Sequence, residues 1–151
     1  MFARLISTPI GPLYAEAGVK GIIQIQLLVL AQGYRENPSP LLDELANRIK
    51  AYFDGEHESF RKIKLDYSGM PAKRVALYER VRRIPYGKTR SYGDLAHELL
   101  LSARAVGAGM RACPFFPVVP AQRVIHADGR IGGFGGAEGI KEWLLRFEGA
   151  I

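Results

Sequence analysis

The chain is short of cysteine and of long apolar runs, and each shortage excludes a class of protein. Its 151 residues include one cysteine, Cys113, which excludes an internal disulfide and a cysteine-rich zinc site. The longest apolar run, residues 21–31, is interrupted by Gln24 and Gln26 and is far shorter than the roughly 20 residues of a membrane span. Residues 1–10 lack the apolar core and the cleavage site of a signal peptide. We therefore expect a soluble cytoplasmic protein in a reducing compartment.

The composition is that of an ordinary globular chain. Apolar residues make up 48% and charged residues 24%, so a chain of this length can bury a core and fold alone. The 17 glycines and nine prolines are too few for a collagen-like or low-complexity protein. No repeat is present, and the length excludes a large multidomain machine.

The first half of the chain lacks net charge, and the net positive charge is concentrated in the second half. Residues 1–70 carry eight Lys or Arg and eight Asp or Glu, whereas residues 71–151 carry thirteen basic residues and seven acidic ones. The net charge of +6 therefore belongs to the second half. Ten of its thirteen basic residues are arginines, which favours bidentate contact with phosphate. The pattern indicates either a polyanion-binding surface or a solvated basic face.

The first half has the pattern of a small α/β unit. Apolar or alternating stretches at residues 2–7, 13–17 and 21–30, separated by Gly- and Pro-containing turns, predict an antiparallel meander. A helix is expected from its N-cap Ser39 to Gly55, with Leu41, Leu45, Ile49 and Tyr52 at helical spacing. Residues 56–66 are consistent with a further strand or an extended linker. The unit spans residues 1–66.

The second half, residues 67–151, is predicted to be helical. One basic helix presents Val75, Tyr78 and Val81 and ends at residues 84–87. Two further short helices are expected to begin at Ser91, with Asp94 in a capping-box-like position, and at Ser102. Their almost direct connection is the pattern of a helix-turn-helix. An amphipathic last helix over residues 140–147 is expected to place Trp143 in the core.

The helix after Ser102 has almost no side-chain bulk. Its residues include Ala103, Ala105, Gly107, Ala108 and Gly109, although each glycine costs about 1 kcal/mol relative to alanine. Tight packing inside the protein would explain the small residues. Close approach to a nucleic acid groove would explain them as well, with Arg104 and Arg111 as the only large polar side chains of the helix.

Several sequence blocks in the second half resemble the C-terminal domain of O6-alkylguanine-DNA alkyltransferases. In order along about residues 70–150, the blocks are Arg83-Ile84-Pro85-Tyr86-Gly87, Ser91-Tyr92, Arg104-Ala105-Val106-Gly107, Met110-Arg111, Pro120-Ala121-Gln122-Arg123-Val124, Gly132-Gly133-Phe134, Lys141-Glu142-Trp143-Leu144-Leu145 and Glu148-Gly149. The resemblance implies a small N-terminal α/β domain of the RNase H-like type and a C-terminal helical winged helix-turn-helix domain that binds DNA.

The resemblance also implies a mechanism and a set of site residues. The family binds the minor groove, inserts an arginine in place of an extruded guanine and transfers the alkyl group to a cysteine; extrusion gives access to an atom hidden in the stack. The residues that match DNA contacts are Tyr92, Arg104, Ala105, Gly107, Arg111 and Arg123. Those that match the lesion pocket are Tyr92, Cys113, Ala121, Gln122, Val124, Gly132, Gly133, Phe134 and Glu148.

The sequence departs from the family at the point of chemistry. Ala121 stands at the position of the nucleophilic cysteine and Gln122 at that of the following histidine. Alkyl transfer needs a thiolate, so the resemblance is to alkyltransferase-like proteins, which bind the lesion and flag it for repair. It implies no catalytic residue, no cofactor and no metal. The implied partners are duplex DNA containing O6-alkylguanine and nucleotide excision repair proteins, with the chain a monomer and no membrane contact.

Other interpretations stay open at this point. Cys113 would be a displaced nucleophile in an active alkyltransferase, or Ala121 would be an engineered replacement of the cysteine. A plain DNA binder without lesion preference is the third alternative. His57, His97 and His126 show no ligand spacing and are expected at the surface or in caps. Residues 132–136 are expected to form a flexible pocket loop, because no lysine or serine completes a nucleotide-binding motif.

Overall fold

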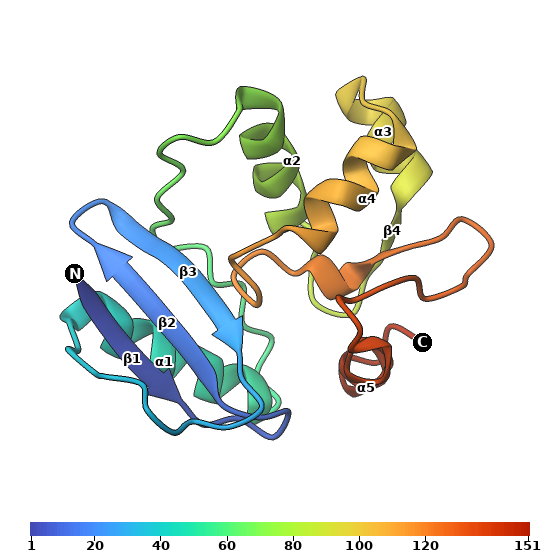
Figure 1. The fold of residues 1–151 in the computed structure, drawn as a ribbon. Helices are drawn as coiled ribbons and strands as arrows, with labels where there is room; N and C mark the ends of the chain where they lie inside the picture. Colours follow the sequence, from blue (N-terminus) through green and yellow to red (C-terminus); the bar gives the residue numbers. More distant parts are fainter. The chain divides into compact units, whose positions relative to one another are not determined.

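The computed structural model describes all residues from 1 to 151, and the chain forms two compact units (Figure 1). The first unit consists of Met1–Ser68 together with Pro114–Val118, and the second of Gly69–Cys113 and Val119–Ile151. Residues 114–118 are connected to the rest of the first unit by a hydrogen bond, which the backbone N–H of Ile25 donates to the carbonyl of Pro114 at 2.7 Å.

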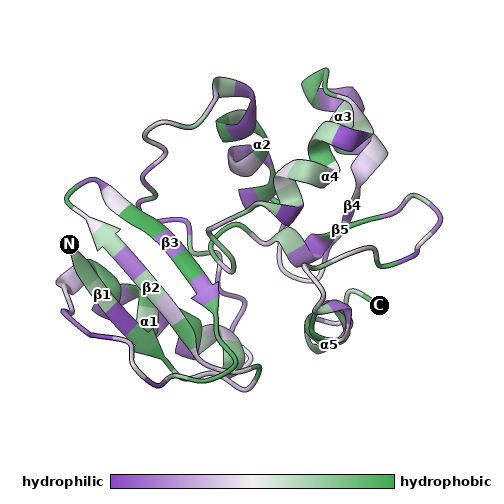
Figure 2. Cartoon of the chain, in the orientation of Figure 1, coloured by the Kyte–Doolittle hydropathy of each residue, from purple (hydrophilic) through white to green (hydrophobic).

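The first unit contains an antiparallel sheet in the order β1 (Phe2–Ile6), β2 (Leu13–Gly18) and β3 (Gly21–Leu27). The predicted meander is thus confirmed, and Figure 2 shows hydrophilic and hydrophobic residues following one another along its strands. The last strand ends three residues earlier than expected. Val29 and Leu30 lie beyond it and are exposed, so the apolar run continued past the strand.

One helix, α1 (Pro40–Phe53), packs against this sheet. Its N-cap is Ser39, whose Oγ accepts a hydrogen bond from the backbone N–H of Leu42 at 3.3 Å, as the sequence predicted. The residues that it buries are Leu42, Leu45, Ala46, Ile49 and Tyr52. The helix ends before Gly55, which has a φ of +95°.

The segment at residues 56–66 does not form a strand. Only its end meets the sheet. There the backbone carbonyl of Lys64 accepts from the N–H of Ile22, and the backbone N–H of Asp66 donates to the carbonyl of Ile22, both at 2.8 Å. The rest is turn and coil that buries Phe60 and Ile63. Of the two alternatives the linker is therefore closer to the structure, because only residues 64–66 pair with the edge of β3.

The second unit is mainly helical. Its helices are α2 (Ala72–Arg82), α3 (Tyr92–Leu99), α4 (Ala103–Arg111), the 3-10 turn η1 (Ala121–Arg123) and α5 (Glu138–Phe147). The strands β4 (Arg90–Ser91) and β5 (Val124–Ile125) form a short parallel pair. None of the helices of the chain is long and apolar enough to cross a membrane.

The helix-turn-helix is confirmed as α3 and α4. The Oγ of Ser91 accepts from the N–H of Asp94 at 2.9 Å, and the Oγ of Ser102 accepts from the N–H of Ala105 at 3.0 Å. The turn between the helices passes through Leu100, which has a left-handed φ of +57° and an exposed side chain.

The last helix corrects one prediction. Trp143 is 42% exposed and stacks on Phe147 with ring centroids 5.1 Å apart, so it is not a core residue. The buried positions of α5 and its cap are Lys141, Leu144, Leu145 and Glu148. The helix is amphipathic as expected, but its buried face lies on the other side from Trp143.

Candidate nucleic-acid interface

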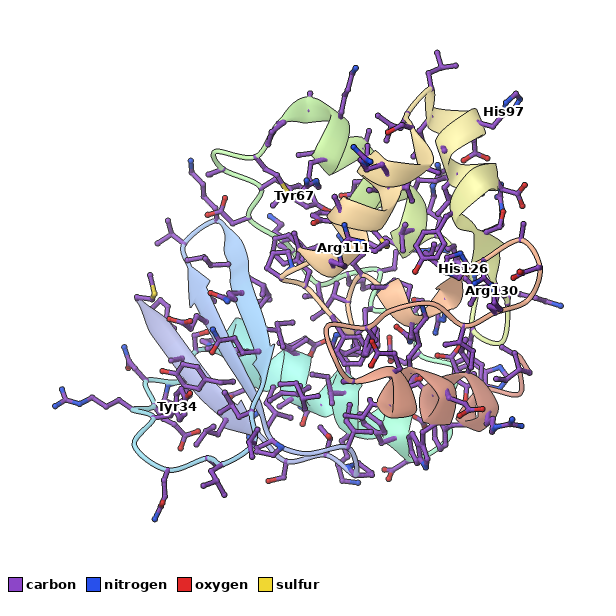
Figure 3. The ribbon with its side chains drawn as sticks, turned by 45° about the vertical axis from the view of Figure 1, so that its right-hand side comes forward. Tyr34, Tyr67, His97, Arg111, His126 and Arg130 are labelled. Carbon is purple, nitrogen blue, oxygen red and sulfur yellow. The ribbon has the colours of Figure 1, made fainter.

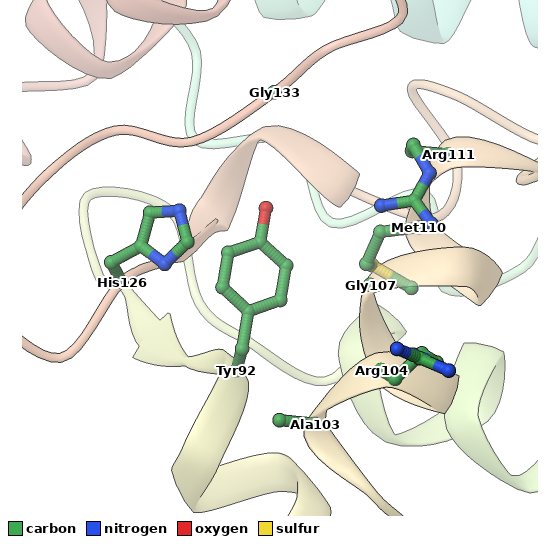
Figure 4. Close-up of a pocket in the computed structure, with 8 residues that line it drawn as sticks. All are labelled: Tyr92, Ala103, Arg104, Gly107, Met110, Arg111, His126 and Gly133. Atoms are coloured by element: carbon green, nitrogen blue, oxygen red, sulfur yellow. The ribbon is translucent and has the colours of Figure 1, made fainter.

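The second unit contains a pocket with a volume of about 460 Å³ beside the helix-turn-helix. In Figure 4 the rings of Tyr92 and His126 stand on one side of it and the side chains of α4 on the other. The lining residues are Tyr92, Ala103, Arg104, Gly107, Met110, Arg111, His126 and Gly133.

The pocket brings together five residues that the sequence singled out. Tyr92 comes from the first turn of α3, while Gly133 comes from the loop before α5. The other three are Arg104, Gly107 and Arg111 of α4. Ala105 is exposed on the same helix but does not line the pocket.

The two arginines of α4 are free of acidic partners. Both Arg104 and Arg111 are exposed, and neither has a carboxylate within 4 Å. Figure 3 shows Arg111 on α4, with His126 and Arg130 on the segment that follows β5. No Asp or Glu lines the pocket, so its charged lining is cationic.

The small residues of α4 have two different explanations. Gly109 is buried, and a Cβ there would lie 2.5 Å from Cδ2 of Leu77, so internal packing requires a glycine. Its carbonyl also accepts from the hydroxyl of Tyr78 at 2.7 Å. A Cβ on Gly107 would instead meet Nη1 of Arg111 at 3.4 Å, an ordinary contact, and this residue lines the pocket. Packing therefore leaves the small size of Gly107 unexplained.

Lys141 lies behind the pocket lining, bonded to two of its residues, and sequence reasoning missed this role. Its buried ammonium group donates to the carbonyl of Val124 at 2.6 Å, to the hydroxyl of Tyr92 at 3.3 Å and to the carbonyl of Gly133 at 3.4 Å. Burial lowers the pKa of Lys141 to about 8. Its spacing from Leu144, Leu145 and Glu148 places it on the buried face of α5, and that spacing was visible in the sequence.

The second missed residue is His126, which was expected in a surface or capping role. Its ring lies 5.0 Å from that of Tyr92, with an angle of 52° between the planes. Burial raises the pKa of the Tyr92 phenol, and the nearby charge of Arg111 opposes this effect. The phenol is therefore neutral at physiological pH and can donate a hydrogen bond into the pocket.

The positions of the family's cysteine and histidine lie in η1, outside the pocket lining. Ala121 and Gln122 are both buried there. Nε2 of Gln122 donates to Oε2 of Glu148 at 3.1 Å, whereas its Oε1 is buried without a hydrogen-bond partner. Val124 is fully buried and Phe134 half-buried, and neither lines the pocket.

Arg123 corrects the expected set of DNA contacts. Its side chain is buried, with Nε 2.9 Å and Nη2 3.1 Å from the two carboxylate oxygens of Glu148. Nη1 donates to the carbonyl of Ile84 at 2.7 Å. A guanidinium group held inside the unit in this way is not available to a phosphate, so Arg123 has a structural role.

Cys113 follows the C-cap of α4 and is half-buried. It does not line the pocket, and it lies close enough to Tyr78 to raise, together with burial, the pKa of that phenol. No group of three or more His, Cys, Asp or Glu side chains in the chain is arranged to hold a metal ion.

At Gly132 the loop before α5 lies close to the rings of Tyr92 and His126. Its φ is +85°, and a Cβ there would lie 2.9 Å from the hydroxyl of Tyr92 and 3.3 Å from Nε2 of His126. A glycine is therefore required for both conformation and space. The loop thus supports the two rings from behind rather than lining the pocket at this residue.

Comparisons with known proteins match both parts of the chain. A family model described as "6-O-methylguanine DNA methyltransferase, ribonuclease-like domain" matches residues 1–67. A second, described as "6-O-methylguanine DNA methyltransferase, DNA binding domain", matches residues 72–150. The expected fold class is confirmed: a small N-terminal α/β domain of the ribonuclease-like type is joined to a C-terminal helical DNA-binding domain.

Individual relatives agree over nearly the full length. A "DNA base-flipping protein" of Thermus thermophilus is 52% identical over 97% of this chain and 99% of the relative. A "Methylated-DNA--protein-cysteine methyltransferase" of Mycobacterium tuberculosis is 36% identical over 96% and 90%. The crystal structure of Mycobacterium tuberculosis OGT in complex with DNA matches with a TM-score of 0.84 at 31% identity, over 99% of this chain and 94% of that one. The chain belongs to the 6-O-methylguanine DNA methyltransferase family.

Proposed function

We propose that this protein extrudes an O6-alkylguanine from duplex DNA into the pocket of its second unit and holds it there without removing the alkyl group. One observation carries the proposal: the chain has the family's DNA-binding domain, and Ala121 stands at the position where the resemblance places the nucleophilic cysteine. The protein is then a sensor of alkylated guanine and not an enzyme.

The chemistry of the missing residues supports a binding role. Alkyl transfer to sulfur needs a thiolate nucleophile and a neighbouring group that lowers the pKa of the thiol. The methyl group of Ala121 cannot attack, and the amide of Gln122 cannot accept a proton at neutral pH. The one cysteine, Cys113, lies beside Tyr78 and not in the pocket lining.

The arrangement of α4 supports extrusion of a base. Arg104 is exposed in the first turn of the helix and lines the pocket, flanked by Ala103 and Ala105. An arginine inserted into the minor groove from a helix this slim would fill the space that the extruded base leaves. The base would then lie between the ring of Tyr92 and Met110, and each stack on an aromatic ring is worth about 1–3 kcal/mol.

The names of the relatives fit this interpretation. The Thermus relative, at 52% identity, is named for base flipping, whereas the Mycobacterium relative, at 36%, is named for methyl transfer to cysteine. A bound lesion that is never repaired would persist as a signal. We infer that it marks the damage for nucleotide excision repair proteins.

The decisive experiment compares two duplexes that differ in one alkyl group. We expect the protein to bind the duplex with a single O6-methylguanine at least about tenfold more tightly, a difference of about 1.4 kcal/mol. Equal affinity for the two duplexes would instead indicate a plain DNA binder. Mass spectrometry of the recovered protein should show no added methyl group, and an adduct on Cys113 would overturn the non-enzymatic assignment.

Replacement of Arg104 tests insertion separately from general DNA binding. In Arg104→Ala we expect the preference for the alkylated duplex to fall by about tenfold, with a smaller loss of affinity for undamaged DNA. Arg146→Ala is the matched control, because Arg146 is also exposed but is paired with Glu142 on α5. A preference that survives in Arg104→Ala would contradict the role assigned to this side chain.

A further inference from the structure

The mouth of the pocket carries a histidine that no part of the proposed function uses. His126 faces the pocket next to Tyr92 (Figure 4), and its side chain is half-buried. Its ring packs beside that of Tyr92, and its ring nitrogens make no hydrogen bond within the protein. A half-buried imidazole without a hydrogen-bond partner is available to a ligand.

The backbone fixes the position of this ring. The N–H of His126 donates to the carbonyl of Arg130 at 2.9 Å, and its carbonyl accepts from the N–H of Gly129 at 3.0 Å. On the far side Gly132 leaves room for Nε2, because any Cβ there would lie 3.3 Å from it. The imidazole is therefore held beside Tyr92 without occupying its own hydrogen-bonding capacity.

The charges around the pocket select for an anion. Arg104 and Arg111 of α4 are the charged groups of the lining, and Lys141 of α5 lies behind Tyr92. The acidic group that faces His126 is Asp128, and its carboxylate is held by Nε of Arg130 at 2.8 Å. Glu138 of α5 acts on Lys141 and does not line the pocket.

An alkylated guanine is neutral, so it cannot be the group that this charge arrangement recognises. A nucleotide that leaves the duplex brings a phosphodiester with it. We propose that His126 binds a backbone phosphate of the extruded nucleotide and takes up a proton when it does so. This inference rests on the proposed function and adds to it the group that anchors the flipped nucleotide.

The sign of the pH dependence follows from the charges. An anion beside an imidazole favours its protonated form, so binding takes up a proton and the affinity rises as the pH falls. The other groups that face His126 hold their charge over about pH 5.5 to 7.5, since arginine stays protonated and Tyr92 neutral. The pKa of Asp128 is lowered mainly by the backbone N–H of Arg130, so this carboxylate stays ionised. Lys141, with a pKa of about 8, is mainly protonated over this range and begins to lose its proton at the upper end, in the wild type and in His126→Gln alike.

The test measures the dissociation constant of the full-length protein for a duplex with one O6-methylguanine at constant ionic strength. For the wild type we expect about tenfold tighter binding at about pH 5.5 than at about pH 7.5. In His126→Gln, which keeps an amide donor but cannot be protonated, the affinity should vary less than about twofold over the same range. His97→Gln is the matched control, because His97 is exposed on α3 outside the pocket, and it should behave like the wild type.

A second measurement needs no variant. Calorimetric titrations of the wild type in two buffers of different ionisation enthalpy should report uptake of a fraction of a proton per duplex at about pH 6.5. The logarithmic salt slope at about pH 5.5 should also exceed that of His126→Gln by about 0.9, the value for one neutralised phosphate.

The outcomes separate the two proposals. If the wild type does not prefer the alkylated duplex at any pH, the proposed function is overturned, and this inference with it. If the preference is present but His126→Gln keeps the pH dependence of the wild type, or no proton is taken up, only the role of His126 is overturned.

Discussion

At the scale of single residues, Glu148 is the clearest example of a family position with a structural role. Its carboxylate accepts from Gly87, Gln122 and Arg123, at distances between 2.9 and 3.1 Å. It therefore joins the turn after α2, the turn η1 and the end of α5. A backbone N–H, an amide and a guanidinium thus take up its lone pairs.

Removal of the charge of Glu148 should therefore destabilise the fold. Because Glu148→Gln leaves the guanidinium of Arg123 buried without its counter-charge, we expect the free energy of unfolding to fall by about 3–5 kcal/mol. Glu142→Gln, which breaks an exposed pair with Arg146, should cost less than about 1 kcal/mol. Urea unfolding of the three proteins measures both values, and equal costs would show that the buried pair has no special weight.

Lys141 should make stability depend on alkaline pH. Burial lowers its pKa from 10.5 to about 8, so between these values the native state has released a proton that the unfolded chain still binds. The unfolded state then holds more protons, and stability rises with pH by up to about 1.4 kcal/mol per unit. We expect this rise in urea unfolding between about pH 8 and 10. It should be absent in Lys141→Met, and a parallel rise in that variant would exclude Lys141 as its source.

Residue roles were predictable from the sequence only where they depend on residue type and neighbours along the chain. Ala121 and Gln122 exclude thiol chemistry at these two positions by their side chains alone. The burial of Arg123 depends on Glu148, 25 residues away, and the position of His126 depends on Tyr92. Contacts of this kind leave no pattern in a local stretch of sequence, so these two roles came from the structure.

At the scale of elements, local signals predicted the helices well. Ser39 and Ser91 each cap a helix as expected, because an N-cap satisfies backbone groups within three residues. Ser102, where a helix was predicted to begin, caps that helix as well. The prediction was less successful where pairing decides the structure. Residues 64–66 pair with β3 over a short stretch only, and residues 114–118 join the first unit through a backbone hydrogen bond from Ile25. Neither contact is visible in the local sequence.

The two glycines of helix α4 allow a matched test of the two explanations for its small residues, which are DNA approach at Gly107 and internal packing at Gly109. Alanine at either glycine adds up to about 1 kcal/mol of helix propensity. Gly107→Ala should therefore stabilise the protein, since its Cβ meets only Nη1 of Arg111 at 3.4 Å, but weaken binding to the alkylated duplex. Gly109→Ala should be about 1–3 kcal/mol less stable than Gly107→Ala, because its Cβ would lie 2.5 Å from Cδ2 of the buried Leu77.

Thermal unfolding and anisotropy titration of these two variants measure stability and binding separately. Tight approach of α4 to DNA would be contradicted if Gly107→Ala bound the alkylated duplex as well as the wild type. The packing explanation of Gly109 would fail if Gly109→Ala were as stable as Gly107→Ala.

At the scale of the whole molecule, the charge is divided as the sequence indicated. The first unit has eight basic and eight acidic residues, and the second has thirteen and seven. The structure refines this count, because several arginines of the second unit are bonded to carboxylates. The exposed basic side chains there without an acid within 4 Å are Lys73, Arg83, Lys88, Arg104 and Arg111.

The number of free basic side chains sets the salt dependence of DNA binding. Each phosphate that the protein neutralises contributes about 0.9 to the slope of log affinity against log salt, so these five side chains together contribute up to about 4.5, apart from His126 at low pH. We expect Arg111→Gln to lower the slope by about 0.9, because its guanidinium is exposed and free. Arg146→Gln should leave the slope unchanged, since Glu142 already neutralises that charge. Anisotropy titrations between about 50 and 200 mM salt resolve such a difference. Equal slopes for the two variants would show that net charge, rather than the free arginines of α4, governs association.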